Sequence, residues 1–505
     1  MLAPQSFQGI YTAFLDRAEQ HPDKPAFELK DGRHITYHDL LTDAQRIAHL
    51  LTRAGVQPGD RVACQVKKSV RAVAAYLAVL QIGGIYLPLN IAYTGAELQY
   101  FLDDAEPTAV VVDPANAATV RDMTSDVAIF TLDAQGSGTV SACETRLTTI
   151  APATAEDPAA ILYTSGTTGR SKGAVLTHGN LASNCHALLE AWEFTGEDRL
   201  IHALPIFHIH GLFVAINMSL AAGATMLWMD GFDVDGIVDR MSTATVLMGV
   251  PTFYTRMLAS ERLTRDAVQN MRLFISGSAP LLTADFEAFY ERTGHYILER
   301  YGMTETGMNT TNPYHRERRP GSVGQPLPGI DVTVADPKTG EAMPAGQIGS
   351  IEVRGPNVFD RYWRNPDKTR EEKRDNGFFI TGDQGYYDTD GYLHISGRSK
   401  DMIISGGYNV YPKEVEQLLD DHPLIAESAV IGIPLADLGE SVVAVVVAAN
   451  GQVPSDAELT GMLADQLARY KQPRAYRVIP ELPRNVMGKV QKAQLREEFA
   501  DIFTF

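Results

Sequence analysis

The sequence predicts an α/β protein with a large N-terminal part built on parallel sheets and a small α+β domain at its C-terminus. Three observations support this fold class. The chain has 505 residues, 45% of them hydrophobic and 21% charged, so it is long enough to need several hydrophobic cores. Its N-terminal half places apolar helices between apolar strands, an order typical of parallel sheets covered by helices. After Gly397 the segments become shorter and more charged.

Residues 61–89 form the clearest strand, helix and strand unit. RVACQV predicts the first strand and IYLPL the second, and between them apolar residues recur at helical spacing, at Val70, Val73, Leu77 and Leu80. Residues 72–93 carry no charge, and this uncharged stretch is long enough to suggest a membrane-spanning helix. That stretch is interrupted by Gln81, Gly83, Gly84, Pro88 and Asn90. We therefore expect a buried helix, a turn and a strand, and no membrane segment.

Further apolar strands are expected at AVVVD from Ala109 and AAILY from Ala159. Residues 133–160 are rich in Gly, Ser, Thr, Ala and Pro, which indicates a surface connection between two lobes. Near the C-terminus, strands are predicted at 428–433 and 442–448, followed by a helix that begins near Ser455. The division expected from these patterns is residues 1–399 and residues 400–505.

Composition excludes several classes of function. The net charge of -18 and the pI near 5.2 argue against a nucleic-acid surface, and no block of Lys and Arg is present. Cys64, Cys143 and Cys185 have no paired spacing, so neither a disulfide framework nor a zinc site is indicated. The N-terminal residues have no basic or Arg-rich start, and the C-terminal DIFTF is no peroxisomal signal. A cytoplasmic protein is expected.

The segment YTSGTTGRSKG, residues 163–173, suits a phosphate group. Its glycines allow backbone amides to turn toward an anion, its Ser and Thr hydroxyls add donors, and Lys172 adds a positive charge. A flexible linker is the alternative, but linkers seldom follow a buried strand and combine so many donors with a lysine. A P-loop kinase does not fit, because Ser171 stands where that motif requires its second glycine and Gly173 follows Lys172.

With this segment the chain resembles the AMP-binding family of adenylate-forming enzymes, which includes acyl-CoA synthetases, peptide-synthetase adenylation domains and luciferases. Six further motifs occur in the order of that family: LPIFHIHGL from Leu204, SGSAPL from Ser276, ERYGMTET from Glu299, TGD from Thr381, GRSKDMIISGGYNVYPKEVE from Gly397, and PRNVMGKVQK from Pro483. The resemblance implies a large N-terminal domain of sheet subdomains with flanking helices, which holds nucleotide and acid. It also implies a small mobile C-terminal domain that rotates between two catalytic poses.

The same resemblance assigns the nucleotide site. Glu305 would hold the Mg²⁺ that bridges the ATP phosphates, a suitable role for a hard carboxylate oxygen, and Thr304 would contact the α-phosphate. Asp383 would accept hydrogen bonds from the ribose hydroxyls, with Arg398 supporting the same sugar. The remaining ATP-binding residues implied are Thr164, Ser165, Gly166, Thr167, Thr168, Gly169, Lys172, Ser278, Ala279, Pro280, Tyr301 and Gly302.

Three positions in the C-terminal motifs are assigned to successive steps. Lys489 would carry adenylation, because a cation between the attacking carboxylate and the α-phosphate offsets their repulsion. Rotation about the hinge Lys400 would then withdraw Lys489 and bring up a thiol-binding face with Gly406, Gly407 and Tyr408, where coenzyme A attacks. Removing the charge of Lys489 would stop adenylation, so a lysine acetyltransferase is a candidate partner.

The acid pocket resembles that of the malonyl-CoA synthetase branch, through MGVPTFYTR, SGSAPL and ERYGMTETGMNTTNPY. A dicarboxylate needs a cation for the carboxylate that is not activated, and Arg256, assisted by Ser278, is the candidate. If Arg256 is buried, short monocarboxylates should be poor substrates. The other pocket residues implied are His208, Ile209 and Met308, the last two bordering the α-carbon. His208 and His210 lack a third ligand at suitable spacing, so we expect pocket walls rather than a metal site.

The leading hypothesis is therefore ATP-dependent ligation of malonate, with methylmalonate acceptance open, to coenzyme A. The alternative is an acyl-CoA synthetase for another acid, medium-chain or aryl. A degenerate nucleotide sensor would lack Lys172, Glu305 or Lys489, but all three are present. The expected partners are the small molecules ATP, Mg²⁺, a dicarboxylic acid and coenzyme A, with no nucleic acid and no membrane.

Overall fold

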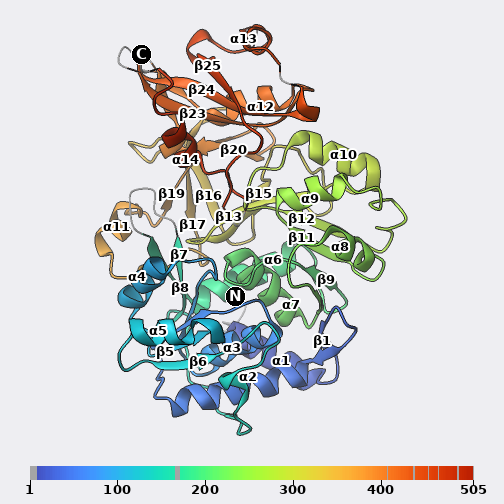
Figure 1. The fold of residues 1–505 in the computed structure, drawn as a ribbon, viewed down its shortest axis with the longest axis vertical. Helices are drawn as coiled ribbons and strands as arrows, with labels where there is room; N and C mark the ends of the chain where they lie inside the picture. The colour runs from blue at the N-terminus through green and yellow to red at the C-terminus, as the bar shows by residue number, and fades with distance from the viewer. Residues whose placement is uncertain are drawn as a thin grey trace, which may run out of the picture.

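The computed structural model describes residues 8–164, 171–405, 408–435, 438–452, 454–464, 466–485 and 488–503. Four sheets organise them, and the elements from β21 onward lie at one end of the long axis, opposite helices α1 (Ile10–Gln20) and α2 (Tyr37–Arg53) (Figure 1). Mixed α/β architecture with a large N-terminal and a small C-terminal part confirms the predicted fold class.

The first sheet has seven strands in the order β18-β8-β7-β4-β3-β5-β6. Its strands are β3 (Arg61–Gln65), β4 (Ile85–Pro88), β5 (Ala109–Val112), β6 (Ala128–Thr131), β7 (Pro158–Thr164), β8 (Lys172–Thr177) and β18 (Arg361–Tyr362). β3 and β4 are parallel and are joined by α3 (Val70–Gln81), as predicted for residues 61–89. The connection 133–160 joins β6 to β7 within this one sheet, so the expectation that it separates two lobes is wrong.

Helix α3 explains the uncharged stretch that follows Arg71. Its side chains from Ala72 to Gln81 are buried all round, which is why the helix has no polar face. α3 packs against α2, and the Tyr76 hydroxyl donates to Asn217 Oδ1 at 3.1 Å in α7 (Asn217–Ala222). Among the described residues, no helix is long and apolar enough to cross a membrane.

The second sheet has nine strands in the order β15-β14-β13-β12-β11-β9-β10-β1-β2. Its strands are β1 (Pro25–Glu28), β2 (His34–Thr36), β9 (Arg199–His202), β10 (Thr225–Trp228), β11 (Val246–Gly249), β12 (Leu273–Ser276), β13 (Leu298–Met303), β14 (Gly307–Thr311) and β15 (Gln325–Pro326). β9 to β13 are parallel, and one continuous core joins this sheet to the first. The carboxyl ends of its parallel strands therefore face one side, where loops can gather functional groups.

Helices cover these two sheets. The remaining helices of this part are α4 (Gly95–Ala105), α5 (Ala117–Met123), α6 (His178–Ala191), α8 (Val234–Met241), α9 (Pro251–Leu258), α10 (Thr283–Thr293) and α11 (Pro366–Glu371), with a π-helical turn at His210–Ile216. A third, antiparallel sheet follows, β16 (Asp331–Ala335), β17 (Gly349–Arg354), β19 (Phe379–Tyr387) and β20 (Leu393–Arg398).

The residues from Ile403 onward build a fourth sheet with its own core. Its elements are β21 (Ile403–Ser405), β22 (Tyr408–Val410), α12 (Pro412–Asp420), β23 (Ile425–Leu435), β24 (Gly439–Ala448), α13 (Asp456–Ala464), β25 (Ala475–Val478) and α14 (Lys492–Glu498). The strands expected at 428–433 and 442–448 and the helix near Ser455 are confirmed. The boundary at residues 399 and 400 stays a prediction.

Candidate functional site

The predicted site residues come from four separate parts of the fold that meet between the last two sheets and the N-terminal sheets. The ends of β7 and β8 contribute Thr164 and Lys172, and the turn between β13 and β14 contributes Thr304 and Glu305. The third sheet contributes Asp383 and Arg398. The C-terminal part contributes Lys489.

The phosphate segment joins two antiparallel strands, since Thr164 pairs with Lys172 across β7 and β8. A P-loop of the Walker type instead leads from a strand into a helix, so this topology agrees with the exclusion made from spacing. Five predicted residues of this segment lie outside the described residues, and their roles stay predictions: Ser165, Gly166, Thr167, Thr168 and Gly169.

Glu305 is 6% exposed in the turn between β13 and β14. Its Oε1 accepts hydrogen bonds from the Thr164 hydroxyl at 3.3 Å and the Tyr362 hydroxyl at 3.1 Å. Burial raises the pKa of this carboxyl above its ordinary value. Thr304 precedes it in the same turn and is half-buried.

The donor set around Glu305 fits Mg²⁺ that arrives with ATP. No group of three His, Cys, Asp or Glu side chains that could hold a metal occurs within the described parts of the chain. Mg²⁺ in nucleotide sites is typically held by one or two carboxylates together with substrate phosphates. A single buried carboxylate with a neighbouring hydroxyl matches that arrangement.

Asp383 lies between two groups of the predicted nucleotide site. Its Oδ2 accepts a hydrogen bond from the Tyr301 hydroxyl at 2.6 Å, and its Oδ1 lies 3.1 Å from the Arg398 Nε. Asp383 and Arg398 face each other across β19 and β20, which is why two residues 15 positions apart share one ion pair. Gly302, next to Tyr301, has no room for a side chain, because an added Cβ would lie 2.1 Å from the Gly307 carbonyl oxygen.

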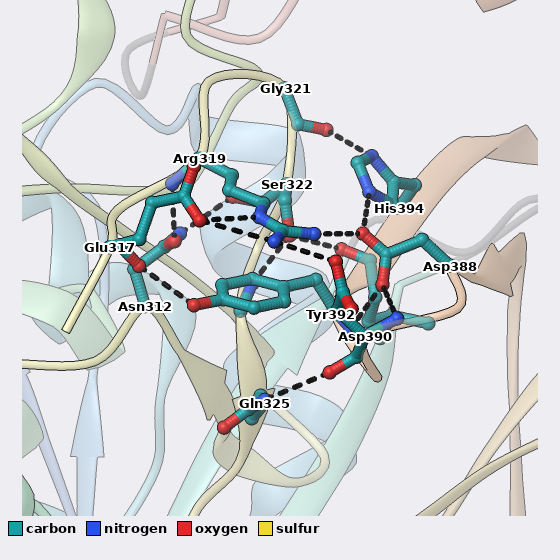
Figure 2. Close-up of polar contacts among 12 residues, drawn as sticks. Asn312, Glu317, Arg319, Gly321, Ser322, Gln325, Asp388, Asp390, Tyr392 and His394 are labelled. Atoms are coloured by element: carbon teal, nitrogen blue, oxygen red, sulfur yellow. Dashed lines mark hydrogen bonds and ion pairs between the residues drawn. The ribbon is translucent and has the colours of Figure 1, made fainter.

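The hairpin that carries Asp383 and Arg398 is tied to the loop 312–325 by Arg319. The Arg319 guanidinium pairs with Asp388 at 2.8 Å and Asp390 at 2.7 Å, and lies over the Tyr392 ring at 4.3 Å (Figure 2). His394 extends the contact, with its ring nitrogens 3.2 Å from the Gly321 carbonyl and 3.3 Å from Asp388 (Figure 2). The β19–β20 hairpin is thereby anchored to the loop that follows β14.

Lys489 is directed toward the N-terminal site. Desolvation by surrounding protein and the nearby Arg398 charge lower its pKa to about 8, although Asp383 and Glu305 oppose the shift. Its neighbour Gly488 abuts Thr252 of α9. Burial and the charges of Lys489 and Arg300 lower the pKa of His208 to about 3. The structure therefore brings the predicted adenylation lysine close to the nucleotide and acid residues.

The chain just after β12 has strained backbone. Ser278 has φ of 75°, a left-handed conformation uncommon for serine, and its Oγ lies 3.5 Å from His210 Nδ1. Ala279 is half-buried and Pro280 is exposed. An added Cβ at Gly277 would lie 2.4 Å from the guanidinium carbon of Arg300, so glycine allows this loop to lie directly on that arginine.

Arg256, predicted to bind the carboxylate that is not activated, lies on the surface rather than in a buried pocket. It is exposed on α9, its guanidinium carbon lies 5.8 Å from the centre of the Phe232 ring, and no ion pair to it is found among the described residues. The condition of burial, on which rejection of monocarboxylates depends, is not met. Its contact with the acid stays a prediction.

Arg300 is the residue that sequence reasoning missed. It is 3% exposed on β13, and its Nε and Nη2 are buried without a hydrogen-bond partner among the described residues. Burial lowers the pKa of this guanidinium to about 9, and burial with the Arg300 charge lowers the pKa of His210 well below its ordinary value. The signal was present in ERYGMTET, where a charged residue lies inside a buried strand, but no role was predicted for Arg300 itself.

The other predicted acid-pocket residues are buried nearby. Ile209 precedes the π-helical turn that contains His210, and Met308 follows the tight turn after Glu305. The Asn184 side chain holds the Met308 backbone with two hydrogen bonds, at 2.8 and 2.9 Å. Ile209 and Met308 are both buried, and their place in the acid pocket stays a prediction.

The predicted hinge residue Lys400 and the predicted thiol-binding residue Tyr408 are both exposed. Lys400 is exposed in a short turn after β20. Tyr408 is 60% exposed and stacks on Tyr470 with ring centres 4.7 Å apart. Gly406 and Gly407 lie outside the described residues.

Comparison with protein families matches the AMP-binding enzyme over residues 14–363 and the AMP-binding enzyme C-terminal domain over residues 414–489. A long-chain-fatty-acid–CoA ligase of Bacillus subtilis is 34% identical over 98% of this chain and 95% of its own length. A malonate–CoA ligase of Arabidopsis thaliana is 33% identical over 97% of this chain and 89% of its own length.

Among solved structures, ATP-bound MatB from Rhodopseudomonas palustris is 51% identical, with a TM-score of 0.95 over 98% of this chain and 99% of that one. The apo form of MatB gives a TM-score of 0.85 over the same shares of the two chains. The arrangement described above is therefore nearer to that of the ATP-bound form. The family profiles cover most of both parts of the chain, and the chain belongs to the family of AMP-binding enzymes.

Proposed function

We propose that this protein ligates malonate to coenzyme A at the expense of ATP, through a malonyl adenylate, and releases malonyl-CoA, AMP and pyrophosphate. The observation that carries the choice of acid is Arg300, a buried cation with two unpartnered guanidinium nitrogens beside His208 and His210. A buried charge without a partner is costly, and a carboxylate of the substrate would satisfy it. The similarities to a malonate–CoA ligase and to MatB support the same choice.

His208 and His210 are expected to be neutral, so they do not supply the positive charge that a dicarboxylate needs. Burial, together with neighbouring positive charge, keeps the pKa of both rings far below neutral pH. The cation at this end of the pocket is then Arg300, with Arg256 nearer the surface. We propose that Arg300 binds the carboxylate that is not activated, and that Arg256 guides the acid toward it.

For ATP, Lys172 would contact the phosphates, Thr304 the α-phosphate and Asp383 the ribose hydroxyls. Mg²⁺ held by Glu305 would neutralise phosphate charge and favour departure of pyrophosphate. The reacting malonate oxygen attacks the α-phosphorus, the bond to the pyrophosphate oxygen breaks, and the Lys489 ammonium lies where negative charge develops. Its position near Glu305 and Asp383 supports that role.

Thioester formation would follow rotation of residues 400–505 about Lys400. The exposed Tyr408 and Tyr470 pair supports this step, because two stacked aromatic rings on the surface offer an apolar face to an incoming group. In the rotated pose this face would lie at the acyl carbon, where the coenzyme A thiol adds and AMP leaves.

An acyl-CoA ligase for an apolar acid is the second candidate, favoured by the similarity to a long-chain-fatty-acid–CoA ligase. Pyrophosphate release with ATP, Mg²⁺ and coenzyme A separates the two across malonate, methylmalonate, succinate, acetate, octanoate and coumarate. We expect malonate to lead, with methylmalonate limited by the bulk of the buried Ile209 and Met308 side chains. A leading monocarboxylate would move the enzyme to the second candidate and leave the adenylate chemistry intact.

The pH dependence of adenylation is expected to report Lys489. Its lowered pKa of about 8 means that the cation is present below that pH and lost above it. Adenylation should therefore fall as pH rises through about 8, while thioester formation from a supplied adenylate should lack this limb. Single-turnover rates of each half-reaction from pH 6.5 to 9.5 measure the difference, and identical profiles would contradict the assignment.

We also propose Lys489 as a site of acetylation by a lysine acetyltransferase. The residue keeps solvent-accessible surface, and its lowered pKa supplies the neutral amine that acyl transfer needs. Mass spectrometry of cell-derived protein, followed by recovery of adenylation after enzymatic deacetylation, tests this proposal. Unmodified Lys489 in protein with reduced activity would contradict it.

A further inference from the structure

Lys172 and Glu305 face the same phosphates in the proposed function, yet they carry opposite charges and lie in one partly buried region. Left to themselves, a lysine and a glutamate at this depth would pair directly and become less available to ATP and Mg²⁺. The structure keeps them apart. The Tyr362 ring lies against Lys172, with the ammonium 4.5 Å from the ring centre, and the Tyr362 hydroxyl lies 3.1 Å from Glu305 Oε1.

A second carboxylate, that of Glu372, forms an ion pair with Lys172. Lys172 Nζ lies 3.3 Å from Glu372 Oε1, and Lys368, one helical turn earlier, lies 3.0 Å from the same oxygen. The other oxygen of Glu372 accepts the Tyr362 hydroxyl at 2.6 Å. The single Tyr362 hydroxyl proton is thus shared between Glu372 at 2.6 Å and Glu305 at 3.1 Å, so one side chain contacts both carboxylates, and Glu305 Oε2 is left for a metal ion.

The backbone holds this set in register. Tyr362 lies in β18, which pairs with β8, the strand that begins with Lys172. The Trp363 amide donates to the Gly173 carbonyl at 2.7 Å, and the Phe359 amide donates to the Glu305 carbonyl at 2.7 Å. One short segment, 359–363, is thus hydrogen-bonded to the backbone of Glu305 and to that of Gly173, the residue after Lys172. Tyr362 is 2% exposed, so its ring has no alternative position.

We infer that Tyr362 and Glu372 are positioning residues, which hold Lys172 and Glu305 apart and aimed at the phosphates and Mg²⁺ of incoming ATP. The inference rests on the proposed function for the roles of Lys172 and Glu305. Neither Tyr362 nor Glu372 needs to touch the reacting atoms, since they act through the lysine and the metal-binding carboxylate. Groups that orient a metal ligand commonly change metal affinity or activity by about 10-fold to 100-fold when removed.

The test compares Tyr362→Phe and Glu372→Gln with a matched control, Tyr387→Phe, whose hydroxyl donates to the Val332 carbonyl at 3.0 Å in the third sheet. Calorimetric titration with Mg·ATP, without any acid, is the main measurement. Tyr362→Phe and Glu372→Gln should each weaken Mg·ATP binding by about 10-fold to 100-fold and shift the Mg²⁺ requirement upward. Tyr387→Phe should bind Mg·ATP as the unaltered protein does.

Thioester formation from a supplied acyl adenylate is the second measurement, because that half-reaction needs neither the triphosphate nor its metal. It should stay unchanged in both variants. Unaltered Mg·ATP affinity in both variants, or an equal loss in both half-reactions, would overturn the inference. If Tyr362→Phe fails to fold, Glu372→Gln, isosteric and only half-buried, decides the matter. Binding of Mg·ATP requires no acid. If malonate proves not to be the substrate, the Mg·ATP titration still tests the roles of Tyr362 and Glu372.

Discussion

Replacing Lys489 with alanine is expected to lower the rate of adenylation by about 100-fold to 1,000-fold or more, the cost typical of losing one preorganised electrostatic contact to a transition state. The structure directs this lysine toward Glu305, Asp383 and His208, so no other ammonium of the C-terminal part is needed to explain the chemistry. Thioester formation from a supplied malonyl adenylate should be retained, because the rotated pose would already have withdrawn Lys489. Single-turnover measurement of each half-reaction gives the result.

A lysine elsewhere on the surface is the matched control for that experiment. Lys338 is exposed in the turn after β16, and Lys338→Ala should leave both half-reactions unchanged. Equal losses of the two half-reactions in Lys489→Ala would refute the division of labour between poses. A loss confined to thioester formation would reverse it.

The second large effect is expected at Arg300. Arg300→Met keeps an unbranched side chain, though a shorter one, and removes its charge, so kcat/KM for malonate should fall by roughly 10,000-fold, as when a site built around a polar group loses its pair. Activity with acetate should change far less, because acetate has no second carboxylate. The preference between the two acids is therefore the quantity to measure, at saturating ATP and coenzyme A.

Arg300→Met should lose activity without losing thermal stability. The Arg300 guanidinium is buried with two unpartnered nitrogens, so its removal should not lower the midpoint of thermal unfolding. Arg256→Ala is the matched comparison, since it removes an equal charge from an exposed position. It should cost less malonate activity than Arg300→Met. A collapse in Arg256→Ala with full activity in Arg300→Met would return the distal carboxylate to Arg256.

Local elements were predictable where one periodicity or one turn signal decided them. The helix α3 and its two strands follow from apolar spacing and from the Gly83-Gly84 turn, and the strands β23 and β24 follow from apolar runs rich in Val and Ile. The connection 133–160 was misjudged because a polar surface loop has the same composition whether it joins two lobes or two strands of one sheet.

The sequence by itself was enough to indicate the AMP-binding family, because the motifs that carry Lys172, Glu305, Asp383 and Lys489 are short and local. Only the tertiary structure decided which arginine is buried, since burial depends on strands that lie far apart along the chain. It also decided that Tyr362 and Glu372 lie between Lys172 and Glu305, although Glu372 is 200 residues from Lys172. Sequence spacing carries no information about such contacts, because pairing of β18 with β8, and not local conformation, brings them together.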